Sequence, residues 1–167
     1  MSDKNLTEEQ SIFTTRVVFS KDRKNRYALT MDWDSSNREK LAIIMTFPST
    51  ADSYLLDQTT MLVRNGAIKN GFGSVTILNL FPTINSQQPK ADRVNYSIIT
   101  SECESADKII VAYGRSMSYA EEKEKLLQAL KPMGEKLYTI IDSKGLPFSH
   151  PLSPSAHEWN IQKIDIE

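Results

Sequence analysis

The chain has 167 residues, of which 40% are hydrophobic and 25% are charged, and it carries a formal net charge of −1. This length suits one domain with a sizeable core, and the near-neutral charge excludes a general attraction to nucleic-acid backbones, so that any contact with DNA requires a local patch. The single cysteine, Cys103, excludes an intramolecular disulfide and a cysteine-cluster zinc site.

In the N-terminal third, we expect a flexible segment over residues 1–10 and then strands over 12–20 and 26–33. The turn-forming residues 34–37 predict a hairpin that pairs the second strand with the third. This third strand, over residues 41–47, is a continuous apolar run of the kind that is buried on both faces.

The middle of the chain alternates between helical and strand patterns. Apolar residues at helical spacing predict helices over 54–69 and 92–106, and Cys103 falls on the buried face of the second. Between them, residues 74–82 read as a buried strand that ends at Asn79 and Phe81 before a proline. A further strand is expected over 108–113.

Toward the C-terminus, Ser118 and Glu121 form a capping-box pattern for a helix that ends near Lys131. The charged run 121–125 is interpreted as its solvated face. A last strand is expected over 137–141.

Strands that alternate with helices favour βαβ units. We therefore predict an α/β fold: one three-layer αβα domain over residues 11–155 with a mostly parallel central sheet, followed by a polar tail over 156–167. No apolar run is long enough to span a bilayer and the first residues are polar, so a cytoplasmic protein without a membrane partner is expected.

In such a fold, the loops after the parallel strands converge on one edge of the sheet, which is where small ligands bind. Four loops are expected to meet there, over residues 47–52, 79–85, 114–116 and 148–155. The candidate site residues on or beside them are Phe47, Ser49, Thr50, Asp52, Asp57, Asn79, Phe81, Asn85, Arg115 and His150.

Two of these residues suggest a particular chemistry. The Asn79 amide beside an aromatic ring suits a flat heterocycle such as a nucleobase; the alternative is an amide that caps a turn beside a core phenylalanine. His150, near Pro147 and Pro151 on a stiff loop, can donate to a developing oxyanion; the alternative is a surface histidine without a role. No glycine-rich phosphate loop and no metal-ligand spacing occurs, so neither a cofactor nor a metal is expected.

Several short segments resemble an uncharacterised family of bacterial and phage proteins, domain of unknown function 1643. The likeness runs from about Arg26 to Leu152. The segments that carry it are Pro48-Ser49-Thr50-Ala51-Asp52, Asp57-Gln58-Thr59, Asn79-Leu80-Phe81, Gly145-Leu146-Pro147 and His150-Pro151.

The same segments also resemble the uracil-DNA glycosylase superfamily, through Phe47-Pro48, Asn79, Gly114 and the run that begins at His150-Pro151. This likeness implies a glycosylase-like fold in which Asn79 reads a base edge, Phe47 or Phe81 stacks on the base, and His150 stabilises a departing base anion. A base in a polymer would then be flipped into the pocket.

The sequence leaves three functions open. The first is a protein that recognises a nucleobase, a nucleotide or nucleic acid and whose catalysis is lost or altered, since Phe47 stands where the glycosylases place a residue that positions water. The second is an active N-glycosidase in which Asp52 or Asp57 positions water. The third is a protein-interaction module, possibly encoded by a phage, with a protein partner and no small-ligand site.

Overall fold

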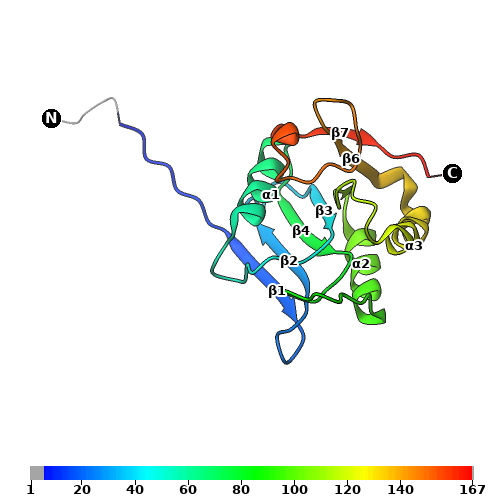
Figure 1. Ribbon diagram of the computed structural model, residues 1–167. Helices are drawn as coiled ribbons and strands as arrows, with labels where there is room; N and C mark the ends of the chain where they lie inside the picture. The colour runs from blue at the N-terminus through cyan, green and yellow to red at the C-terminus, as the bar shows by residue number, and fades with distance from the viewer. Residues whose placement is uncertain (1–5, 167) are drawn as a thin grey trace.

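The computed structural model describes residues 6–166, which form one seven-stranded sheet with three α-helices (Figure 1). The strands are β1 (Thr14–Phe19), β2 (Arg26–Asp32), β3 (Lys40–Met45), β4 (Ser74–Asn79), β5 (Lys108–Val111), β6 (Leu137–Ile141) and β7 (Asn160–Lys163). The helices are α1 (Gln58–Lys69), α2 (Arg93–Ser105) and α3 (Ala120–Leu130), with two 3-10 helices, η1 (Lys131–Lys136) and η2 (Pro154–Ala156). Of the expected flexible segment, residues 1–5 lie outside the described residues; residues 6–13 form no regular element and run away from the domain in Figure 1.

Four parallel strands, in the order β4-β3-β5-β6, form the centre of the sheet. Strands β2 and β1 are added antiparallel at one edge and β7 at the other. Within the described residues, three of the six strand pairings are thus parallel and three antiparallel. The α/β class is confirmed, but the sheet is mixed rather than mostly parallel, because only the connections through α1, α2 and α3 return the chain in the same direction.

The predicted hairpin between the second and third strands is wrong. Strand β2 pairs with β1 and β4, while β3 lies on the far side of β4. The connecting residues 33–39 cross the beginning of β4, where the Gly73 N–H donates to the Glu39 carbonyl over 2.9 Å. A Cβ atom on Gly73 would overlap the Asn37 carbonyl oxygen, so a glycine is needed where the chain crosses.

Helices cover both faces of the sheet, which explains why β3 is apolar from Leu41 to its end. Its side chains alternate between the faces. Ala42 and Ile44 belong to a core cluster with residues of α2 and α3, whereas Leu41 and Ile43 belong to the cluster that packs on α1. Cys103 of α2 is fully buried, as expected, and burial raises the pKa of its thiol to about 12. No helix in residues 6–166 is long and apolar enough to cross a membrane.

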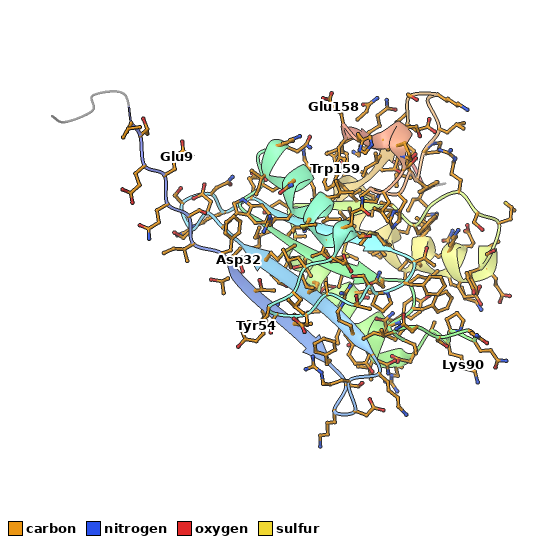
Figure 2. All side chains as sticks on the ribbon, turned by 60° about the vertical axis from the view of Figure 1, so that its left-hand side comes forward. Glu9, Asp32, Tyr54, Lys90, Glu158 and Trp159 are labelled. Carbon is orange, nitrogen blue, oxygen red and sulfur yellow. The ribbon has the colours of Figure 1, made fainter. Side chains whose placement is uncertain are left out.

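Residues 156–167, expected to be a polar tail, continue the domain as far as they are described. Strand β7 pairs antiparallel with β6, and Trp159 packs against Gly66 in the middle of α1 (Figure 2). A Cβ atom on Gly66 would overlap the indole ring. The contact between Gly66 and Trp159 therefore holds the C-terminal segment on the face that α1 covers.

This contact can be tested by measuring whether one substitution raises or lowers the stability of the protein in two backgrounds. In an open helix, Gly→Ala stabilises by about 0.8–1 kcal/mol. We expect Gly66→Ala instead to destabilise the protein by about 1 kcal/mol or more, since overpacking costs about 1–3 kcal/mol. In a Trp159→Ala background, the same change should become stabilising. Denaturant unfolding measures both effects, and an equal effect in the two backgrounds would contradict the contact. Gly134→Ala is the control for an added methyl group without overlap, because a Cβ atom at this position meets no atom within 4 Å.

Candidate functional site

A pocket of about 420 Å³ lies beyond the carboxyl ends of β3 and β5. The chain reaches β4 on one side of β3 and β5 on the other, so the strand order reverses between β3 and β5. In open α/β sheets, ligands bind in the crevice at such a reversal, and the volume falls in the range of roughly 300–1,000 Å³ that small-ligand sites occupy. The pocket is lined by Met45, Thr46, Phe47, Ser49, Thr59, Tyr113, Ser116, Ser118, Tyr119, Lys123, His150 and Leu152.

Aromatic rings form much of this lining, and other rings hold them. Phe47 stacks on the buried Phe81, with centroids 5.5 Å apart and planes 19° apart. Tyr119 meets both rings edge-on, at 5.7 Å from Phe47 and 4.8 Å from Phe81. Tyr113 stacks in the same way on Phe148, at 5.1 Å. Phe47 remains 42% exposed, so part of its surface is available to a ligand.

Two aromatic residues at the pocket adopt left-handed backbone conformations. Tyr119 has φ of 59° and Phe148 has φ of 60°. Such conformations cost on the order of 1–3 kcal/mol each in non-glycine residues and cluster at functional sites. Tyr119 also replaces the predicted cap of α3: the helix begins at Ala120 with no side-chain cap, so the capping box expected from Ser118 and Glu121 does not form.

His150 presents a single hydrogen-bond donor. Its Nδ1 accepts the Leu152 N–H over 3.1 Å, which assigns the proton of the neutral ring to Nε2. Burial lowers the pKa of the imidazole below its ordinary value, so the neutral form is favoured. Because His150 lines the pocket, its Nε2–H group is the one that can meet a ligand.

Lys123 is a buried cation in the pocket wall, with 8% of its surface exposed. Its Nζ donates to the Ser116 carbonyl over 2.6 Å and lies 5.0 Å from the Tyr113 ring. The interpretation of residues 121–125 as a solvated face is wrong at this position. Lys123 shares one side of α3 with Leu126 and Leu130, three and seven residues later, which puts it on the side that faces the sheet.

Behind the pocket, a fully buried arginine holds the loop that follows β3. Arg26 is 1% exposed, and its Nη1 donates to the Ser49 hydroxyl over 3.2 Å and to the Ser49 and Ala51 carbonyls over 3.3 and 3.0 Å. Its Nη2 donates to Asn79 Oδ1 over 3.5 Å. Burial lowers the pKa of the guanidinium to about 10, and the nearby Asp57 carboxylate opposes that change.

The structure brings three of the expected site residues together in the pocket: Phe47, Ser49 and His150. Phe81 lies behind Phe47 and is 1% exposed. Three of the four expected loops contribute lining residues, and the loop over residues 79–85 does not. The reason is that β4 lies outside the reversal point, between β2 and β3.

Asn79 is placed away from the pocket surface. It is 1% exposed, its Oδ1 accepts from Arg26, and its carbonyl accepts from the Asn95 amide over 3.0 Å. Its Nδ2 has no hydrogen-bond partner in the described residues. In this arrangement, the Asn79 side chain supports the Arg26 network rather than facing a ligand.

The two candidate carboxylates cap local structure. Asp52 accepts the N–H groups of Tyr54 and Leu55, which lower its pKa. Asp57 is the N-cap of α1 and accepts the Thr60 N–H over 2.9 Å. Burial raises the Asp57 pKa, but hydrogen bonds from Ser49 and Thr60 outweigh it and keep the pKa below its ordinary value.

The remaining expected residues also lie outside the pocket lining. Thr50 and Asn85 are exposed, and Asn85 sits in a left-handed turn with φ of 55°. Arg115 donates to the buried Asp142 carboxylate over 2.7 Å and to the Ser149 hydroxyl over 3.1 Å. Arg115 thereby ties the loop after β5 to the loop after β6.

The sequence predicted the loop over residues 114–116, which supplies Ser116, but missed the rest of the lining from the β5–α3 connection, namely Tyr113, Ser118 and Tyr119. Tyr113 had a usable signal, since it ends an apolar strand directly before Gly114. Tyr119 had none, because nothing in the sequence marks a tyrosine that will adopt a left-handed conformation.

A wider hollow of about 1,000 Å³ lies at the opposite end of the parallel strands, where β3 and β4 begin. Its lining includes Lys40 and Ser74 at the beginnings of these strands and Asp32 at the end of the antiparallel β2. Figure 2 labels Asp32 at this edge. It is partly walled by residues 10–12, which belong to no regular element. The pocket at the strand reversal is therefore the better candidate site.

Together, the mixed sheet and the pocket at its strand reversal define an α/β protein with a candidate site at the carboxyl ends of β3 and β5. Residues 26–152 match the family described as "Protein of unknown function (DUF1643)", and the chain belongs to this family. The family expectation from the sequence is thus confirmed. No match was found among curated proteins or among solved structures.

The Arg26 network predicts a large loss of stability on one substitution. Arg26→Met would leave the Ala51 carbonyl, the Ser49 groups and Asn79 Oδ1 without their buried donor, and we expect a loss on the order of 3 kcal/mol or more. Arg16→Met is the control: Arg16 is exposed and paired with Glu102 at 3.2 Å, so its loss should cost less than about 1 kcal/mol. Denaturant unfolding compares the two variants, and equal losses of stability would contradict the large contribution of the Arg26 network.

The lowered His150 pKa predicts a pH dependence of stability. Since the folded-state pKa lies below the unfolded value of about 6.5, the unfolded chain binds more protons as the pH falls through 6.5. Stability should therefore fall below pH 6.5 and level off once the pH passes the folded pKa. His150→Gln should remove this component, while the exposed His157 retained in that variant controls for other titrations. An NMR titration of His150 that gave a pKa above 6.5 would contradict the burial argument.

Proposed function

We propose that the protein recognises a nucleobase or nucleotide in the pocket between β3 and β5, and that its catalysis is lost or altered. The observation that carries the proposal is the combination of a ring-supported aromatic wall with one directed donor, His150 Nε2–H. Flat heterocycles stack on aromatic rings, and their edges carry carbonyl and ring-nitrogen acceptors for such a donor.

A likeness to the uracil-DNA glycosylases forms part of this proposal. Phe47-Pro48 follows β3, the first parallel strand, and His150-Pro151 follows β6, the last. Phe47 and His150 both line the pocket. The departure is Asn79, which this likeness would assign to base reading and which is buried against Arg26.

The lining favours recognition over hydrolysis. Cleavage of an N-glycosidic bond through an oxocarbenium-like transition state needs a group that positions water, and a carboxylate usually serves. Among the described residues, no aspartate or glutamate lines the pocket. Phe47 stands where the water-positioning residue would be expected, and its ring cannot hold water.

One contact supports an active N-glycosidase as the second candidate. Ser49 lines the pocket, and its side chain lies near enough to the Asp57 carboxylate to help lower the pKa of that carboxyl. Asp57 therefore reaches the pocket wall through one side chain. Detection of free base released from DNA or nucleosides by wild type, and lost in Asp57→Asn, would favour this candidate.

Binding can be measured by calorimetry with a panel of bases, nucleosides and nucleotides. We expect Phe47→Ala to weaken binding by about 5- to 150-fold, because stacking on an aromatic contributes about 1–3 kcal/mol per base. His150→Ala should weaken it by about 3- to 10-fold through loss of one hydrogen bond.

Phe13→Ala is the matched control, because Phe13 is 44% exposed, much as Phe47 is, and does not line the pocket. No binding of any ligand in the panel, or an equal loss in the Phe13 and Phe47 variants, would overturn the proposal.

A further inference from the structure

Lys123 brings a positive charge into the pocket that no carboxylate neutralises. Among the described residues, no aspartate or glutamate forms an ion pair with Lys123. Its ammonium is instead held by the Ser116 carbonyl at 2.6 Å and the Gly114 carbonyl at 3.5 Å. A buried cation without an anion is costly, and an anionic ligand would offset that cost.

The surroundings of Lys123 suit an oxyanion rather than an apolar group. Ser116 and Ser118 line the same pocket, and their hydroxyls can donate to anionic oxygens. The Ser116 hydroxyl accepts the Ser118 N–H over 3.1 Å, which leaves its own O–H available as a donor. Amide groups in the first turn of α3 have no side-chain cap, and they add partial positive charge at this end of the helix.

The acidic residues of this turn have other partners. Glu121 pairs with Lys125 at 2.6 Å, and Glu122 lies within electrostatic range of the same lysine. Neither residue lines the pocket. The carboxylates of the α3 first turn therefore do not pair with Lys123.

We propose that Lys123, Ser116 and Ser118 form an anion subsite that takes a phosphoryl group, so that the pocket binds nucleotides in preference to bases and nucleosides. The inference rests on the proposed function for the base. A pocket of about 420 Å³ has room for a sugar and phosphate beside a flat ring. The aromatic wall and His150 would hold the base, and the Lys123 end would hold the phosphate.

The first test compares wild-type affinity for a nucleoside with that for its 5′-monophosphate, with inorganic phosphate as competitor. Charge-assisted hydrogen bonds to one phosphoryl group should make the nucleotide bind about tenfold or more tightly. Inorganic phosphate should weaken nucleotide binding more than nucleoside binding. Equal affinity for nucleoside and nucleotide would overturn the anion subsite while leaving base recognition intact, whereas no binding of either would overturn the proposed function itself.

The second test assigns the preference to Lys123. Lys123→Met should reduce nucleotide affinity to about the nucleoside level, while Lys125→Met should leave the preference unchanged. Lys125→Met is a matched control because Lys125 lies on the same helix and is exposed, and because its substitution removes the same charge from the protein. An unchanged preference in Lys123→Met would overturn the assignment. If that variant does not fold, the wild-type comparison with the phosphate competition still decides.

A third arm separates the sources of the phosphate. A single-stranded oligonucleotide with a 5′-hydroxyl end offers only internal phosphates, and the free nucleotide offers only a terminal one. Given the nucleotide preference that the first test requires, tighter Lys123-dependent binding of the oligonucleotide than of the nucleotide would identify internal phosphates as the source. Oligonucleotide binding that is equal in wild type and Lys123→Met would assign the subsite to the terminal phosphate of a free nucleotide.

Discussion

The buried guanidinium of Arg26 is the interaction on which the site depends most. It enters from β2, outside the four parallel strands, and its hydrogen bonds fix the backbone of Ser49 and Ala51 directly after β3. Burying a cation is costly, and Arg26 Nε has no hydrogen-bond partner within the described residues. The donors that are satisfied, on Nη1 and Nη2, depend on these carbonyls and the Asn79 amide staying where they are. The β1–β2 hairpin, which adds two of the three antiparallel pairings to the sheet, thus also shapes the loop that carries Phe47 and Ser49.

The pocket is shaped by several separate interactions rather than by one sequence motif. The reversal of strand order between β3 and β5 opens a crevice. Arg26 fixes one wall of that crevice, the Arg115–Asp142 ion pair ties together the loops after β5 and β6, and the pairs of stacked rings fix the aromatic surface. A site held in this way is preorganised, which lowers the entropic cost of binding a rigid ring.

Much of the fold could be predicted from the sequence, because apolar periodicity reports local structure directly. The run over residues 41–47 gave β3, and helical spacing placed Cys103 on the buried side of α2. The pairing of strands could not be predicted in the same way. Residues 34–37 do form a turn, but the choice between a hairpin to β3 and a crossing past Gly73 depends on β4, more than thirty residues later.

For the site, the sequence determined which loops carry polar and aromatic residues and that Phe47, Ser49 and His150 belong to strand ends at one edge. Only the tertiary structure decided which of these residues face a common space. It buried Asn79 against Arg26, engaged Arg115 with Asp142, and turned Lys123 inward from a run that reads as solvated. The physical reason is that a pattern along the chain records how a residue is spaced from its neighbours in sequence. Its partners across the fold are fixed by strand order, helix rotation and the need to satisfy buried polar groups.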